Sequence, residues 1–167
     1  MEAEFTETGM EAVATTEDNY TTERNKPMPS FNHGAIQANV VFQAKLKYRS
    51  KYRISSETSL RLDEWDSTPD VSIFPLSDLD LENDQVKTTK PPLGAVEILS
   101  PTQPVSELTR KSARYFEKGV KSVWIIIPEF GNVYVFSAAS KYHIYQKGQV
   151  LKDKVLNIEL PVSEFFE

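Results

Sequence analysis

The sequence contains no cysteine and only two histidines among its 167 residues. Without cysteine, the chain cannot form disulfides, thiolate metal sites or a cysteine nucleophile, and it is compatible with a reducing compartment. Two histidines leave little for a histidine-rich zinc centre. No run approaches the roughly 18 apolar residues that a membrane helix needs. The sequence therefore predicts a soluble, cytoplasmic protein.

The first 19 residues also lack any basic residue, and they contain six acidic residues and few large apolar ones. Such a stretch cannot bury enough apolar surface to offset the entropy lost on ordering, so we predict a flexible acidic arm over residues 1–19. It also lacks the basic lead and apolar run of a signal peptide. The remainder, residues 20–167, has the length of a single domain.

Positive charge is in short supply overall, because 19 Lys and Arg against 24 Asp and Glu give a net charge of −5. This balance disfavours binding of nucleic acid by overall positive charge, although a local basic groove remains possible. One basic run, KLKYRSKYR, occupies residues 45–53. It could be a phosphate-binding edge or a solvated helix end, and we favour the solvated end because isolated charge runs usually lie on the surface.

The apolar pattern predicts an α/β (α+β) fold. One helix is expected from a cap at Asn32 to about Tyr48, and a second from a cap at Ser106 to a stop at Gly119. Strands are expected at residues 58–62, 70–74, 94–100, 123–127, 133–136, 141–146 and 155–160. Because a helix separates the early strands from the late hairpins, we expect a mixed β-sheet flanked by helices.

Two acidic residues fall at the start of one predicted strand and in the middle of another. They are Asp70 and, within GAVEILS, Glu97. Magnesium typically binds one or two protein carboxylates and keeps several waters, so this pair and the backbone carbonyl of Ile98 could hold it. The metal would lower the pKa of a bound water and neutralise charge on a phosphate. Lys111, on the following helix, is the best candidate to assist that water.

Each of these residues also has a purely structural interpretation. Asp70 belongs to a Pro-Asp pair, which is common in turns. Glu97 could form a buried salt bridge with Lys111 or Arg110, but we favour the metal site because interior carboxylates cluster at functional sites. Lys111 could instead pair with Glu107 on the helix surface, and that interpretation and the catalytic one are evenly balanced.

The order of several motifs resembles a known family. The motifs are M-P-S-x-x-H (28–33), P-D (69–70), E-I-L-S-P (97–101), the set Glu107, Lys111 and Tyr115, G-V (119–120) and W-I-I-I-P (124–128). Together they resemble the Uma-type family of putative endonucleases, which belongs to the PD-(D/E)XK restriction-endonuclease-like superfamily. The resemblance extends from about residue 20 to the end of the chain.

The resemblance implies a magnesium- or manganese-dependent endonuclease that hydrolyses DNA phosphodiester bonds. Asp70 and Glu97 would be catalytic metal ligands, joined by the carbonyl of Ile98, and Lys111 would act from the helix. Glu23 would be the further acid that is expected before the first helix. The resemblance also implies a homodimer, with one active site for each DNA strand.

Three further residues are possible accessory residues of the site: His33, Glu107 and Tyr115. His33 could assist at the mouth of the site, and Tyr115 lies one helical turn from Lys111 and could orient a carboxylate. The alternatives are a capping or surface histidine, a surface ion pair for Glu107 and a core position for Tyr115.

The sequence departs from the superfamily pattern at Leu99, where a catalytic lysine is expected. Leucine cannot activate water, so activity depends on whether Lys111 reaches the two carboxylates. Ile127 also replaces an acid that often precedes the following proline. An alternative function is therefore a catalytically degenerate member that binds nucleic acid or protein. A third, weaker alternative is a structural metal-binding domain.

Overall fold

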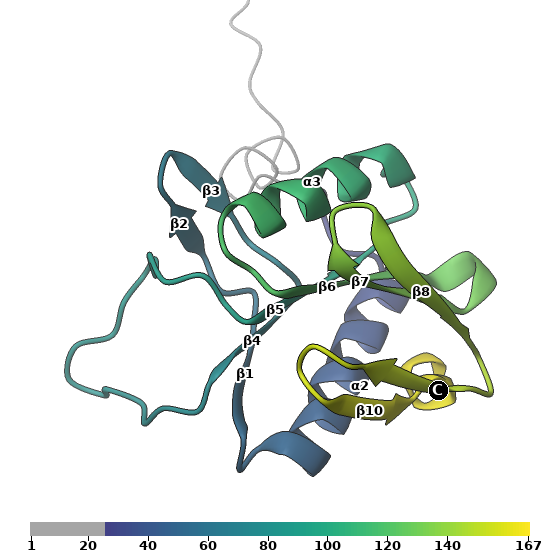
Figure 1. The fold of residues 1–167 in the computed structure, drawn as a ribbon, viewed down its shortest axis with the longest axis horizontal. Coiled ribbons are helices and arrows are strands. Elements are labelled where there is room, and N and C mark those ends of the chain that lie inside the picture. Colours follow the sequence, from purple (N-terminus) through teal and green to yellow (C-terminus); the bar gives the residue numbers. More distant parts are fainter. Residues whose placement is uncertain (1–25) are drawn as a thin grey trace, which may run out of the picture.

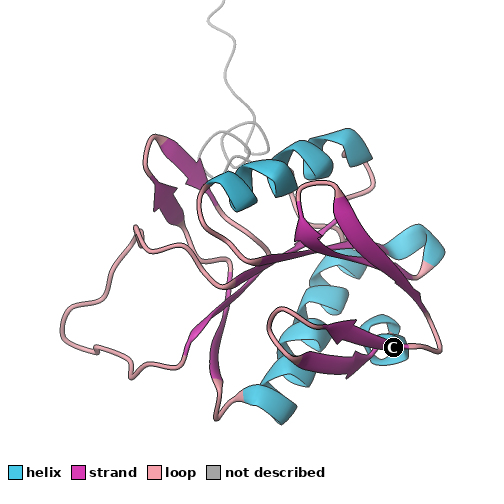
Figure 2. Cartoon of the chain, in the orientation of Figure 1, coloured by secondary structure: helices cyan, strands magenta, loops and turns pink. Residues whose placement is uncertain are grey.

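A central mixed sheet of six strands organises the structure, which is a computed structural model that describes residues 26–167 (Figures 1 and 2). Glu23 and the predicted arm at residues 1–19 lie outside these described residues. The strand order is β1-β4-β5-β6-β7-β8, and only β5 and β6 are parallel neighbours. The strands are β1 (Tyr52–Ser56), β4 (Val71–Pro75), β5 (Gly94–Ile98), β6 (Ser122–Ile127), β7 (Asn132–Ala138) and β8 (Lys141–Gln146).

The two long helices cover opposite faces of this sheet (Figure 1). Helix α2 (Phe31–Tyr48) packs its stripe of Ile36, Val40 and Ala44 on one face. The hairpin of β9 (Val150–Asp153) and β10 (Ile158–Pro161) and the 3-10 helix η2 (Val162–Phe166) pack on the same face. Helix α3 (Val105–Glu117) packs on the other face, beside the hairpin of β2 (Leu60–Leu62) and β3 (Trp65–Ser67). A further 3-10 turn, η1 (Pro128–Phe130), joins β6 to β7.

Strand β5 shows how the two-layer arrangement directs its side chains. Successive side chains of a strand point to opposite faces. Val96 and Ile98 join the core under α2, whereas Ala95 joins the core under α3. Glu97 therefore points toward α3. The apolar run of β6 follows from the same layers, because Trp124 and Ile126 face α2 while Val123 and Ile125 face α3.

The predicted mixed sheet flanked by helices is confirmed, but both helix caps differ from the prediction. Helix α2 is capped by Ser30, whose Oγ accepts a hydrogen bond from the backbone N–H of His33 at 3.2 Å, so Asn32 lies inside the first turn. Pro104 takes the cap position of α3 and makes no side-chain cap hydrogen bond, so Ser106 also lies inside the helix. Proline favours the extended conformation that a cap residue needs.

Two strand predictions also need correction, and strands were missed. The predicted strand at 58–62 is shorter, because β2 begins only at Leu60. The predicted strand at 155–160 is interrupted by a turn at residues 154–157, and β10 pairs with β9, which the sequence did not reveal. Strand β1 was also missed, because Arg53 and its basic neighbours mask the alternation of buried Tyr52 and Ile54.

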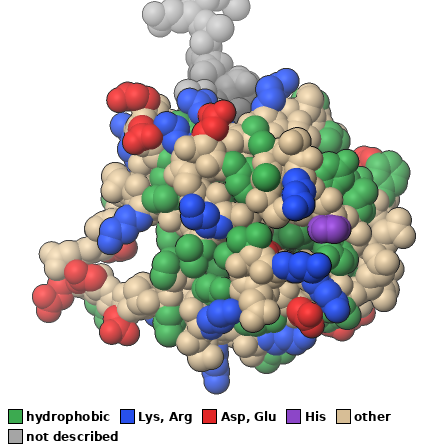
Figure 3. Space-filling model, viewed as in Figure 1, with side chains coloured by type: hydrophobic (Ala, Val, Ile, Leu, Met, Phe, Trp, Pro, Cys, Tyr) green, Lys and Arg blue, Asp and Glu red, His purple; other side chains and the backbone are tan. Residues whose placement is uncertain are grey.

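A long loop between β4 and β5 projects from the sheet (Figure 1). Acidic side chains gather on this loop in Figure 3. Asp80 accepts hydrogen bonds there from the backbone N–H groups of Glu82 and Asn83, at 3.1 and 3.0 Å, which closes a local polar turn. Within residues 26–167, no helix is long and apolar enough to cross a bilayer.

Candidate active site

The pairing of β4 with β5 brings the two predicted carboxylates together. Val71 lies opposite Val96 in this antiparallel ladder, and one further step along the register places Asp70 opposite Glu97. The backbone N–H of Ile98 donates a hydrogen bond to Oδ2 of Asp70 at 2.7 Å. Asp70 is 1% exposed and Glu97 is 4% exposed. Two acidic groups thus share one buried position at the end of β5.

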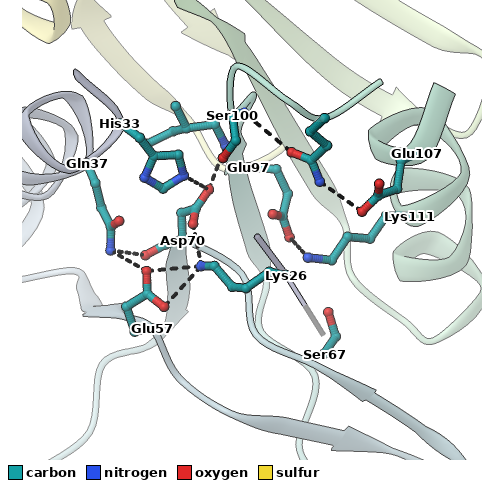
Figure 4. Close-up of polar contacts among 12 residues, drawn as sticks. Lys26, His33, Gln37, Glu57, Ser67, Asp70, Glu97, Ser100, Glu107 and Lys111 are labelled. Atoms are coloured by element: carbon teal, nitrogen blue, oxygen red, sulfur yellow. Dashed lines mark hydrogen bonds and ion pairs between the residues drawn. The ribbon is translucent and has the colours of Figure 1, made fainter. Parts of the chain in front are cut away.

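Helix α3 supplies the partners of Glu97 (Figure 4). The ammonium nitrogen of Lys111 lies 2.7 Å from Oε1 of Glu97. The hydroxyl of Tyr115 donates to the same oxygen at 2.7 Å, and the Ser67 hydroxyl lies 2.7 Å from that of Tyr115. Lys111 and Tyr115 are four residues apart, so they project from the same side of the helix. Lys111 and Tyr115 both contact Oε1 of Glu97, and neither of these contacts involves Oε2.

The pKa values of Asp70 and Glu97 are shifted in opposite directions. Burial raises the pKa of Glu97, and the nearby charge of Asp70 raises it further, against the opposing effect of Lys111. Burial also acts to raise the pKa of Asp70, but its hydrogen bond to His33 and the charge of Lys26 outweigh this and hold that pKa below its ordinary value. The fold therefore favours the charged form of Asp70 and disfavours the charged form of Glu97.

Lys26 is a member of the site that the sequence did not reveal (Figure 4). Its ammonium donates to Oδ1 of Asp70 at 2.5 Å and to both carboxylate oxygens of Glu57 at 3.0 Å each. Gln37 of helix α2 donates to Glu57 at 2.9 Å and to the backbone carbonyl of Asp70 at 3.0 Å. Lys26 is only 6% exposed. A buried cation therefore links two acidic residues of the site.

His33 supports Asp70 from the opposite side. Its Nε2 donates to Oδ2 of Asp70 at 3.1 Å, while its buried Nδ1 has no hydrogen-bond partner among the described residues. His33 precedes Ile36 on the buried stripe of α2, which directs its ring to the sheet. His33 is 2% exposed, so the alternative of a surface histidine is wrong.

The other predicted residues fall in different places. Glu107 accepts a hydrogen bond from the side chain of Gln103 at 2.9 Å, while the ion pair of Lys111 goes to Glu97. The alternative interpretation of Lys111, a surface pair with Glu107, is therefore not what the structure shows. Leu99 packs against the core under α3.

Sequence patterns gave no clear signal for Lys26, Glu57, Gln37 or Ser67. Each stands outside the acidic and lysine positions of the recognised motifs. Glu57 follows the last residue of β1 and has a φ of 55°, in the left-handed region that non-glycine residues seldom adopt. This turn places the carboxylate of Glu57 beside Lys26. Only the three-dimensional turn, and no spacing along the chain, identifies it.

A cleft of about 560 Å³ lies beside His33, the residue that contacts Asp70. It lies between the first turns of α2 and α3, and its walls include His33, Leu99, Ser100 and Gln103. His33 therefore lies between this cleft and Asp70.

The donors suit a hard divalent cation that keeps water ligands. Within residues 26–167 no group of three or more His, Cys, Asp and Glu side chains forms a metal cage. Magnesium does not require one, since one or two carboxylates with waters are usual. Asp70 and Glu97 are two such carboxylates, and the ammonium of Lys26 already stands in for a cation at Asp70. The residues present therefore fit a site with open coordination positions.

Comparison with known proteins identifies related sequences and folds. A family model described as "Uma2: Putative restriction endonuclease" matches residues 21–165. The chain is similar in structure to a putative nuclease belonging to DUF820 from Anabaena variabilis ATCC 29413, with a TM-score of 0.73 and 21% sequence identity over 84% of this chain and 83% of that chain. No curated protein matches the sequence.

Proposed function

We propose that this chain, which belongs to the Uma2 family, is a metal-dependent endonuclease that hydrolyses DNA phosphodiester bonds. The observation that carries the proposal is the 2.7 Å contact between Lys111 and Glu97. It supplies a lysine to the acidic pair although Leu99 occupies the usual lysine position. The nuclease fold that the structural comparison shows is compatible with this chemistry.

Asp70, Glu97 and the backbone carbonyl of Ile98 would hold magnesium or manganese. The bound ion would lower the pKa of a water and neutralise charge on the phosphate. Asp70 is oriented for this role by the N–H of Ile98 and by His33, at 2.7 and 3.1 Å. Glu97 is oriented by the Tyr115 hydroxyl. Oriented ligands reduce the reorganisation that binding and reaction would otherwise require.

Lys111 would orient the attacking water and stabilise negative charge on the phosphate. Its side chain is 12% exposed, so its ammonium is largely withdrawn from bulk water and interacts more strongly with charges in the site. Glu23 remains the proposed further acid. DNA is the proposed substrate, and a homodimer, with one site for each strand, is the proposed assembly.

A second candidate function is a catalytically degenerate member that binds nucleic acid or protein. Leu99 and the ion pair between Lys26 and Asp70 favour it, because the first lacks a catalytic group and the second satisfies a ligand without any metal. The two candidates differ in whether the acidic pair binds a divalent ion.

The test is a calorimetric titration of manganese and magnesium into wild type and Glu97→Gln, with plasmid nicking measured on the same preparations. The endonuclease proposal predicts that metal binding and nicking both vanish in Glu97→Gln while circular dichroism shows a retained fold. Glu117→Gln is a matched control, because it makes the same change at an exposed position of α3. Nicking that persists in Glu97→Gln would contradict the proposal, and metal-independent DNA binding without nicking would support the degenerate alternative.

A further inference from the structure

Ammonium groups already lie among the carboxylates around Asp70. Three carboxylates, those of Asp70, Glu57 and Glu97, are linked by contacts to two ammonium groups, those of Lys26 and Lys111. Lys111 pairs with Glu97, whereas Lys26 contacts both Asp70 and Glu57. A cation is therefore already part of the site.

The ammonium of Lys26 is held like a bound ion. It lies 2.5 Å from Oδ1 of Asp70 and 3.0 Å from each carboxylate oxygen of Glu57. Its burial acts to lower its pKa, but the charges of Asp70, Glu57 and Glu97 outweigh this, so the pKa lies above the ordinary lysine value. The Lys26 ammonium is therefore charged at neutral pH, and it contacts Asp70, the carboxylate proposed as a metal ligand.

We propose that Lys26 is a resident counter-ion that a divalent metal ion must displace from Asp70, and that Lys26 thereby sets the metal affinity of the site. This inference rests on the proposed function, because it assumes that Asp70 is a metal ligand. It adds a residue that no family motif in the sequence indicates.

Electrostatics favours exchange over joint occupancy. The ammonium of Lys26 already lies 2.5 Å from Oδ1 of Asp70. A divalent ion on the same buried carboxylate would lie close to that ammonium, and two neighbouring cations repel strongly in a site of low dielectric. Exchange of Lys26 for the metal ion removes this repulsion.

The chain before α2 allows Lys26 to leave. Lys26 lies in a short coil that precedes Ser30, and it belongs to neither a helix nor a strand. The cap at Ser30 separates this coil from the helix, since its side chain closes the first turn on His33. Movement of Lys26 therefore breaks no ladder of the sheet. Lys111, in contrast, is held within α3.

The first experiment compares manganese affinity, by calorimetry, between wild type and Lys26→Met. Methionine keeps a similar side-chain length without the charge. We expect Lys26→Met to bind manganese about tenfold more tightly or better, because a cation adjacent to the ligand has been removed. Lys121→Met, at an exposed lysine before β6, makes the same charge change and should leave the affinity unchanged. Equal or weaker binding by Lys26→Met would overturn the inference.

A second experiment uses the wild-type protein and does not depend on the stability of a variant. Amine acetylation followed by peptide mass spectrometry measures the reactivity of Lys26 with and without saturating manganese. Displacement predicts low reactivity of Lys26 in chelator and a several-fold increase with metal. Unchanged protection of Lys26 in the metal-bound protein would overturn the inference while leaving the proposed nuclease intact. A protein that binds no manganese in either form would overturn both.

Discussion

The ammonium of Lys111, on helix α3, lies 2.7 Å from Oε1 of Glu97, on strand β5. The superfamily pattern would place a lysine at position 99, two residues along the strand from Glu97 and on the same face. In this chain the positive group comes from the helix that covers that face. The alternation of β5 makes this possible, because Val96 and Ile98 turn toward α2 while Glu97 turns toward α3. The acid of β5 and the lysine of α3 thus lie together, whereas the superfamily pattern takes both residues from one strand.

Replacement of Lys111 by methionine should remove cleavage but keep metal binding. The carboxylates that would bind the metal remain, while the group proposed to orient the water is lost. We expect the nicking rate to fall by about 100-fold or more, the usual range for loss of a positioned proton-transfer or charge-stabilising group. Plasmid nicking and manganese calorimetry on one preparation test this. Lys121→Met is the matched control. Full nicking activity in Lys111→Met would show that the pair with Glu97 is structural.

Replacement of Tyr115 by phenylalanine should reduce stability through one hydroxyl. The ring would stay in the core beside Trp65, with ring centroids 5.0 Å apart. Loss of the hydroxyl removes its side-chain contact with Ser67 and one of the two contacts of Glu97, which keeps its ion pair with Lys111. A buried polar group left without its partner costs about 1–3 kcal/mol. Urea unfolding at neutral pH in chelator measures the change. Tyr142→Phe, at a half-exposed position, should change the free energy of unfolding by much less.

The sequence was sufficient to predict a mixed sheet without its edge strand β1, both helices, and the two acids on neighbouring strands. Strong periodicity identified α2, and the isolated acid in GAVEILS identified Glu97, because each signal is local. Lys26 and Glu57 could not be predicted in this way. They are 31 residues apart in the chain, and only the turn after β1 brings them together. The choice between Glu107 and Glu97 as the partner of Lys111 also depends on how α3 is rotated against the sheet, which periodicity alone does not define.

The stability of the metal-free protein should depend on Asp70 at acidic pH. Burial acts to raise the pKa of Asp70, but His33 and Lys26 hold it below its ordinary value. The unfolded chain, with a pKa of about 3.9, therefore takes up the proton first as the pH falls. The stability that Asp70 contributes is complete above that pH and is lost as the pH falls through the lower folded-state pKa.

Asp70→Asn tests this dependence. The difference in free energy of unfolding between wild type and Asp70→Asn, measured by denaturation in chelator, should be constant from about pH 5 upward and shrink below about pH 4. Glu97→Gln should behave in the opposite sense, since burial and Asp70 raise the pKa of Glu97 and its charged form is the disfavoured one in the fold. If the difference in free energy of unfolding between wild type and Asp70→Asn is the same at pH 3 and pH 6, the pKa of Asp70 is not lowered in the folded protein. Asp78→Asn, in the exposed loop, is the control.

Asp153 provides the contrasting case of a buried acid with a structural role. It is 1% exposed, and one of its oxygens accepts from the Ser122 hydroxyl at 2.6 Å and from the Trp124 indole at 2.8 Å. The other oxygen accepts the backbone N–H groups of Val155 and Leu156 at 3.0 Å each. All four bonds come from neutral donors of the chain, which join the turn after β9 to β6.

Asp153→Asn should therefore destabilise the protein without altering its chemistry. The amide group would direct a donor at existing donors, and loss of a charged acceptor costs about 1.5–3 kcal/mol for each hydrogen bond that fails to re-form. We expect a lower urea midpoint but unchanged manganese affinity and unchanged nicking per folded molecule. Loss of metal binding in Asp153→Asn at a temperature where it is fully folded would contradict this. Burial of an acid alone, then, does not distinguish a ligand from a structural residue. Asp153 contacts four neutral donors of its own fold, whereas Asp70 and Glu97 contact ammonium groups, and manganese titration of the corresponding variants separates the two roles.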